Sequence, residues 1–142
     1  MILVEDLSKS YGRHRALDGV SFAVDAGEVV GFLGPNGAGK STTMRILCGV
    51  LRPDGGRARI AGRDATQGAL EARAAIGYLP EHTPLYRRMR VVDYLDFVGR
   101  VRGLGGAERR AALRRVREDC GLHGYERRRI DELSKGYRQR VG

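Results

Sequence analysis

Eight consecutive residues could bind a polyphosphate: Gly34-Pro35-Asn36-Gly37-Ala38-Gly39-Lys40-Ser41, followed by Thr42. Glycines let the main chain turn its N–H groups toward an anion without obstruction by a Cβ atom. A lysine at the end of such a loop brings positive charge to the outer phosphates, and the hydroxyl of Ser41 suits a magnesium ion. The pattern predicts a phosphate-binding loop, with Lys40 as a catalytic residue, rather than an ordinary glycine-rich turn.

A loop of this kind needs a strand before it and a helix after it. Residues 28–33 are apolar enough to predict a buried strand, and residues 41–47 predict a helix whose N-terminus faces the same anion. An apolar stripe with helical spacing predicts the face of this helix that packs on a sheet: Met44, Leu47, Cys48 and Leu51. The turn chemistry of residues 52–56 should end the helix.

The rest of the first 85 residues predicts a mixture of strands and turns. Residues 2–7 and 16–24 have the alternation of antiparallel edge strands, and residues 25–28 form the turn toward the phosphate loop. Residues 57–61 and 74–79 predict two further strands. We therefore expect residues 1–85 to form an α/β core.

From about residue 91 the apolar pattern becomes helical. One amphipathic segment carries Val91, Val92, Leu95 and Val98 and ends at a glycine cluster, residues 103–106. A second carries Leu113, Val116 and Cys120, with Gly121 as its C-terminal cap. Ser134 is a suitable N-cap for a third helix that begins at Lys135. Residues 86–142 are thus expected to form a helical subdomain.

Composition narrows the class of protein. The net charge is +9, with 23 arginines and three lysines among the basic residues. Three arginine clusters, at residues 109–110, 114–117 and 127–129, lie on predicted helices without interleaved aromatics, so we interpret them as solvated faces and disfavour nucleic acid as a partner. No apolar stretch is long enough to span a membrane, and we see no secretion signal. The two cysteines fit small core residues in a reducing, cytoplasmic compartment.

Four elements in this order resemble the nucleotide-binding subunit of an ATP-binding-cassette (ABC) transporter, most closely of the bacterial export type. They are Tyr11, the phosphate loop, the segment Ile76-Gly77-Tyr78-Leu79-Pro80-Glu81 and the segment Leu133-Ser134-Lys135-Gly136-Tyr137-Arg138-Gln139. The resemblance implies a P-loop NTPase fold of the ABC ATPase type, with an antiparallel β edge, a phosphate-loop core and a helical subdomain. It also implies ATP and Mg²⁺ as cofactors.

The resemblance also implies roles for single residues. Tyr11 would stack on adenine, and Glu81, where many cassettes have glutamine, would approach Mg²⁺ and the attacking water as a second catalytic residue. Ser134 and Gly136 would hold the γ-phosphate of ATP bound to a second subunit, in a head-to-tail dimer. Lys135 and Tyr137 depart from the commonest form of that signature, which has glycine and glutamine in their places.

The resemblance finally implies a place of action and a limit. A separate transmembrane permease subunit would hold the protein at the cytoplasmic face of the membrane and would use the energy of ATP binding and hydrolysis for transport. The match covers about the first two-thirds of a cassette, without the strand that carries the general base, so we expect weak Mg·ATP binding and little turnover from these 142 residues. The alternatives are a cytosolic ABC ATPase outside transport and a nucleotide-binding module without hydrolysis.

Overall fold

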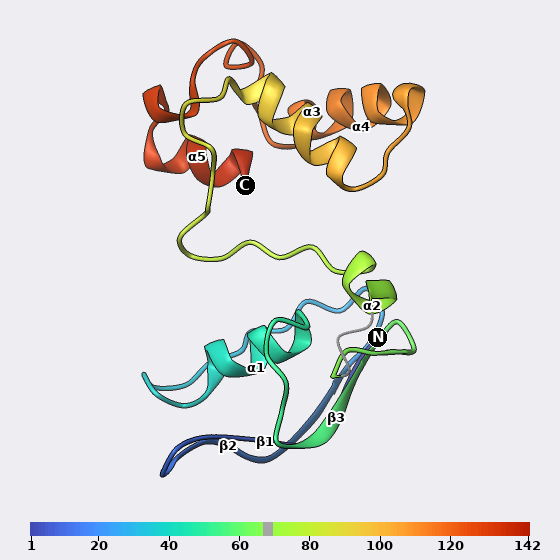
Figure 1. Ribbon diagram of the computed structural model, residues 1–142, viewed down its shortest axis with the longest axis vertical. Helices are drawn as coiled ribbons and strands as arrows, with labels where there is room; N and C mark the ends of the chain where they lie inside the picture. The colour runs from blue at the N-terminus through green and yellow to red at the C-terminus, as the bar shows by residue number, and fades with distance from the viewer. Residues whose placement is uncertain (67–69) are drawn as a thin grey trace. The chain divides into compact units, whose positions relative to one another are not determined.

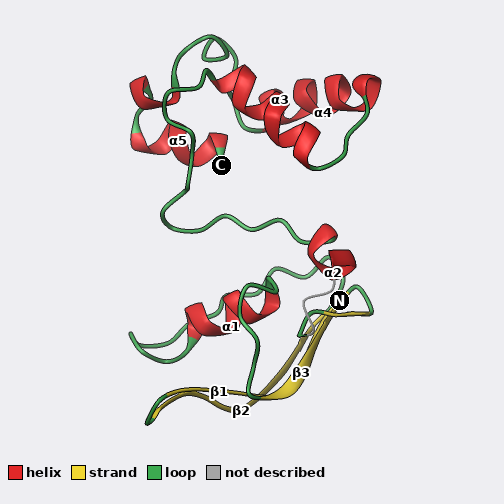
Figure 2. Cartoon of the chain, viewed as in Figure 1, coloured by secondary structure: helices red, strands yellow, loops and turns green. Residues whose placement is uncertain are grey.

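The computed structural model describes residues 1–66 and 70–142. The chain divides into two compact units, Met1–Tyr78 and Leu79–Gly142. Figure 1 shows the first from blue to green and the second from green to red. Strands occur in the first unit, and the second is built from helices and turns (Figure 2). We describe each unit by itself.

An antiparallel sheet forms the frame of the first unit. Its strand order is β2-β1-β3-β4, and its long members are β1 (Ile2–Tyr11), β2 (His14–Val24) and β3 (Gly55–Ile60), with a short β4 (Arg63–Asp64) at the edge. Every pairing is antiparallel. The two N-terminal strands and the strand expected near residues 57–61 are therefore confirmed. The pairs β1–β2 and β3–β4 join neighbouring segments of the chain, whereas β1 and β3 pair over a long separation, such as Ile2 with Ile60.

Helix α1 (Lys40–Leu47) covers one face of this sheet. Its Ile46 and Leu47 are buried in one cluster with Val4, Leu7 and Leu17 from the strands. The predicted stripe is right for Leu47 and for Leu51, which packs against the same cluster, but wrong for Met44, which is 37% exposed. Thr43 and Ile46, which the stripe left out, are fully buried.

Two strands expected from the sequence are absent. Residues 28–33 follow the turn at Ala26 and Gly27 without strand pairing, and Val29 and Leu33 are 97% and 93% exposed. Residues 76–79 are likewise unpaired, and the preceding residues form helix α2 (Leu70–Ala74). A strand requires hydrogen bonds from a neighbour, and these segments have none in the described part of the chain. Phe32 makes ring contact with Phe22 of β2 at 5.5 Å, and Ile76 packs against the core of the first unit.

The second unit contains helices α3 (Val91–Val101), α4 (Gly106–Asp119) and α5 (Lys135–Val141), and a short 3-10 helix η1 (Ile130–Glu132). Its core is one cluster of buried residues: Val91, Leu122, Ile130, Leu133 and Val141. Tyr94, Leu95 and Cys120 pack against it. The three helices predicted in this region are confirmed, and Gly121 follows the end of α4 with φ +59°, the left-handed geometry expected of a helix end.

Helices α3 and α4 lie side by side as a hairpin (Figure 1). Gly99 permits their close approach, because a Cβ atom there would lie 2.9 Å from the side chain of Arg109. The guanidinium of Arg109 donates to Asp96 at 2.7 Å and to the main-chain oxygen of Leu104 at 3.1 Å. One arginine thus fastens α4 to α3 and to the turn between them.

Candidate functional site

The phosphate loop is folded around its own lysine. The Lys40 ammonium donates to the carbonyl oxygens of Gly34 at 2.6 Å and Pro35 at 2.7 Å. The amide of Ala38 donates to the oxygen of Pro35 at 3.2 Å, which closes a turn within the loop. An ammonium has three N–H donors, so one remains for a phosphate oxygen after these two bonds. The charge is therefore held inside the loop, where a polyphosphate would need it.

The end of the loop fits tightly against strand β2. Gly39 has φ +82°, and a Cβ atom there would lie 2.5 Å from Cδ2 of Leu17 and closer still to the carbonyl oxygen of Ala16. Gly39 is the N-cap of α1, and its own carbonyl accepts from the amide of Thr43 at 2.8 Å and from the buried Thr43 hydroxyl at 3.1 Å. These contacts fix the start of α1, where Lys40, Ser41 and Thr42 form the first turn.

Tyr11 lies at the end of the strand hairpin that the loop contacts. Its register partner is His14, two residues before Ala16, so its main chain lies within about 10 Å of the contact with Gly39 by the rise of a strand. The side chain is 47% exposed. A planar ring in this position is free to stack on a base.

In the second unit, Ser134 caps helix α5 as the sequence predicts. Its hydroxyl accepts from the amide of Tyr137 at 3.3 Å. Gly136 is exposed, and no atom lies within 4 Å of the position that a Cβ atom would take. The first turn of α5 therefore keeps an open surface.

Sequence reasoning missed a stack of side chains that supports this turn. The rings of Tyr125 and Tyr137 stack at 4.0 Å between centroids, and Arg128 and Arg140 lie over their outer faces at 5.2 and 5.1 Å. The hydrogen bond to Tyr137 raises the pKa of the Tyr125 phenol. Tyr137, which departs from the commonest signature, thus has a structural partner. The spacing of these residues alone gave no sign of the stack.

A second missed residue is Gln139, which holds the segment containing Glu81. Its amide nitrogen donates to the main-chain oxygen of Glu81 at 2.9 Å, and its amide oxygen accepts from the Thr83 hydroxyl at 2.7 Å. The Glu81 side chain is exposed. Gln139 is the last residue of the signature segment, so its side chain joins that segment to the residues around Glu81.

The described residues contain no group of three or more His, Cys, Asp or Glu that could hold a metal ion by itself. A magnesium ion would therefore need oxygen ligands from a bound polyphosphate besides the Ser41 hydroxyl, which is the usual way Mg²⁺ binds with nucleotides. The residues of α1 fit such an ion. Ser41 belongs to the first unit and Glu81 to the second.

Comparison with known proteins gives the family. The sequence model described as "ABC transporter" matches residues 17–142. The chain is 39% identical to the "Probable multidrug ABC transporter ATP-binding protein YbhF" of Escherichia coli K12, over 99% of the chain and 24% of that protein. It is also 39% identical to the "Nod factor export ATP-binding protein I" of Paraburkholderia xenovorans, over 96% of the chain and 45% of that protein.

Solved structures agree with this assignment. An "ATP binding subunit of ABC transporter" matches 99% of the chain with a TM-score of 0.87 at 33% identity, and the chain covers 59% of it. The cbiO1 protein of Clostridium perfringens, "part of the ABC transporter complex cbiONQ", matches 99% of the chain with a TM-score of 0.84 at 27% identity, and the chain covers 58% of it.

This chain belongs to the ABC transporter family, as its motifs indicated. Its mixed α/β fold is that of part of an ABC ATPase, and membership of the family implies nucleotide binding. The chain spans about a quarter to a half of the length of the curated relatives it matches. No helix in residues 1–66 and 70–142 has the length and apolar character that crossing a membrane requires.

Proposed function

We propose that this chain is the ATP-binding part of an ABC transporter subunit that couples ATP binding and hydrolysis to transport. The observation that carries the proposal is the loop geometry, in which the Lys40 ammonium is held by the carbonyls of Gly34 and Pro35 at the start of α1. Catalysis at such a site comes mainly from positioning and from neutralising the charge on the transferred phosphoryl group.

Each candidate residue then has a proposed role. Residues 34–39 and Thr42 hold the phosphates through the main chain and the first turn of α1, Lys40 neutralises the outer phosphates and Ser41 ligates Mg²⁺. Tyr11 stacks on adenine. In the second unit, Glu81 serves Mg²⁺ and the attacking water, and Ser134 with Gly136 binds the γ-phosphate of a nucleotide held by a second copy. The exposure of Tyr11, Glu81 and Gly136 supports these assignments.

The proposed partners follow from the family. Relatives are named for multidrug transport, daunorubicin resistance and Nod factor export, so we propose an export system with a separate transmembrane permease. The protein would lie at the cytoplasmic face of the membrane and pair head to tail with a second ATP-binding subunit. Within this scheme residues 1–85 form part of the ATPase core and residues 86–142 the helical subdomain.

Titration with a fluorescent ATP analogue tests the loop assignment. Lys40→Ala should weaken binding at least tenfold, because charge-assisted bonds to phosphate are the strong ones. Arg45→Ala is the matched control, since Arg45 is an exposed cation on the same helix. Equal affinities for wild type and Lys40→Ala would refute the proposal, and equal losses in both variants would reduce it to a general charge effect.

A further inference from the structure

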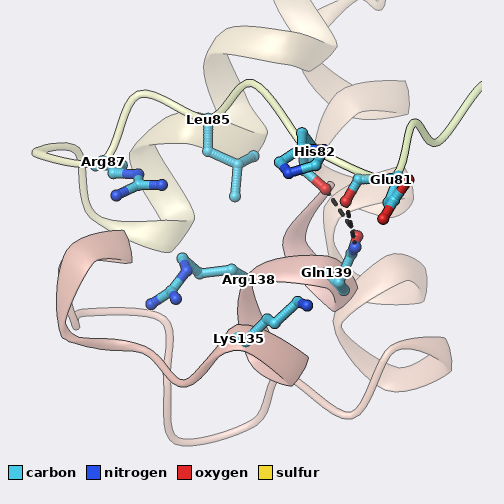
Figure 3. Close-up of a pocket in the computed structure, with 8 residues that line it drawn as sticks. Glu81, His82, Leu85, Arg87, Lys135, Arg138 and Gln139 are labelled. Carbon is cyan, nitrogen blue, oxygen red and sulfur yellow. Dashed lines mark hydrogen bonds between the residues drawn. The ribbon is translucent and has the colours of Figure 1, made fainter.

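The second unit contains a basic cavity, and among its lining residues the proposed function assigns a role to Glu81 alone. Its volume is about 220 Å³, and eight residues line it: Glu81, His82, Thr83, Leu85, Arg87, Lys135, Arg138 and Gln139. In Figure 3, Lys135 and Arg138 come from α5 on one side, and Arg87 comes from the loop on the other. Lys135, Arg138 and Gln139 of the signature segment line this space, whereas Ser134 and Gly136 do not.

Charge in the cavity is unbalanced. Three permanent cations line it, and Glu81 is the one carboxylate among the lining residues. Within the described ranges 1–66 and 70–142, no ion pair joins Arg87, Lys135 or Arg138 to an acidic side chain. Like charges that converge around one space repel each other, and a bound anion would relieve that repulsion.

The walls of the cavity are fixed by hydrogen bonds. Gln139 holds the main chain at Glu81 and the hydroxyl of Thr83, as the dashed lines of Figure 3 show. The loop that carries Arg87 is tied to η1, because the amide of Asp131 donates to the oxygen of Arg87 at 2.9 Å. A site whose walls are held before the ligand arrives loses less conformational entropy on binding.

Helix α5 forms another wall of the cavity. A hydrogen bond orients one of its cations, Arg138, before any ligand binds. The guanidinium of Arg138 donates to the main-chain oxygen of Leu133, which leaves its other N–H groups for a ligand. Arg138 is half-buried, whereas Arg87 and Lys135 are exposed. A guanidinium matches two oxygens of a phosphate at once, and an ammonium adds a point charge.

We propose that this cavity binds a phosphate-type anion independently of the phosphate loop. Its volume is below the roughly 300–1,000 Å³ of sites that enclose drug-sized ligands, so it suits a phosphate group rather than a whole nucleotide. Arg87, Lys135 and Arg138 supply the charge, and the Thr83 side chain and Leu85 complete the wall. The anion could be inorganic phosphate or the phosphate tail of a larger molecule.

The test uses the full chain with Lys40→Ala, so that the phosphate loop does not contribute. Inorganic phosphate, pyrophosphate, ATP and glutamate are titrated at constant ionic strength, and amide NMR signals are followed. Saturable shifts should occur in residues 81–87 and 135–139 with phosphate compounds. Arg87→Gln and Lys135→Gln should each weaken binding roughly tenfold. Tighter binding of pyrophosphate or ATP than of inorganic phosphate would identify a phosphate tail as the ligand, and equal affinities would identify phosphate itself.

Arg114→Gln is the matched control, because Arg114 is exposed on α4, outside the cavity, and removes the same charge. It should change the affinity less than twofold, and circular dichroism should show that all variants keep their helices. Equal weakening by Arg114→Gln and the cavity variants would overturn the proposal, as would tighter binding of glutamate or the absence of saturable shifts. Failure of the proposed function would instead appear as loss of ATP binding in the chain with Lys40 intact.

Discussion

Each unit has its own buried cluster and its own exposed apolar side chains, but the two differ in the burial of particular apolar segments. In the first unit, Val29 and Leu33 before the phosphate loop are almost fully exposed. In the second, Val91, Leu122 and Ile130 are each at most 1% exposed in one cluster. The apolar segment directly before the phosphate loop, residues 28–33, thus has no strand partner among the described residues.

The difference follows from how helices and strands make their hydrogen bonds. A helix bonds within its own segment, so the second unit completes α3, α4 and α5 from local sequence. A strand depends on a neighbour, so the strands that form in residues 1–66 and 70–78 are β1 to β4, which pair with one another. The phosphate loop nevertheless keeps its shape, because Gly39 rests on β2 and Lys40 closes the loop from within.

Among the substitutions that compare the two units, one at Gly39 should have the largest effect on the free energy of unfolding. Gly39→Ala should lower the free energy of unfolding of the first unit by about 4 kcal/mol or more, because the new methyl group would overlap Ala16 and Leu17 at a positive φ. Gly37→Ala is the control: φ is +87° there, but no atom lies within 4 Å, so the loss should be about 1 kcal/mol. Equal losses in urea denaturation would contradict the close fit of loop and strand.

Truncation of apolar side chains would sharpen the contrast in burial. Ile130→Ala should cost about 2–4 kcal/mol, since the side chain is fully buried in the second unit. Leu33→Ala should change stability by less than about 0.5 kcal/mol, since that side chain is 93% exposed. Thermal and chemical denaturation of both variants measures the two values. A larger loss at Leu33 would mean that residues 28–33 are packed in solution.

Loss of the helix cap should have a smaller effect. Ser134→Ala removes the acceptor for the amide of Tyr137 and should cost about 1 kcal/mol. Ser134→Asp keeps an acceptor in the same place and should restore most of the stability. If Ser134→Asp were as unstable as Ser134→Ala, the Tyr125–Tyr137 stack, and not the cap, would hold the start of α5.

The smallest effect concerns Asp96 in the second unit. Hydrogen bonds from Arg109 and Arg100 hold the pKa of the Asp96 carboxyl below its usual range. A lowered pKa stabilises the fold above the unfolded-state pKa, and this stabilisation is lost as the pH falls through the folded-state value. Asp96→Asn should therefore be less stable at pH 7 and equal to wild type near about pH 2. Glu118→Gln removes an exposed carboxylate on α4, serves as the control and should show no such convergence.

The sequence predicted most of what depends on local chemistry. The hairpin of β1 and β2, the start of α1, the helices of the second unit and the Ser134 cap follow from alternation, glycine placement and capping, which act within a few residues. The strands expected at residues 28–33 and 74–79 were wrong, because an apolar run shows that a strand can form but not that a partner is present.

The sequence did not predict the side-chain contacts between residues that lie far apart in the chain. Gln139 reaches Glu81 across 58 positions, and Thr83 across 56. The Tyr125–Tyr137 stack likewise depends on how α5 meets the preceding turn. Such contacts arise from tertiary packing, and no periodicity or motif encodes them.

The account rests on nucleotide binding by the phosphate loop, and the most direct test is a residue-resolved titration of this chain with Mg·ATP. Amide signals of residues 34–42 should shift with a single saturable affinity, signals of Tyr11 and its neighbours should follow with the same affinity, and Lys40→Ala should remove both sets. Shifts confined to residues 79–142, or shifts of residues 34–42 that persist unchanged in Lys40→Ala, would contradict the account.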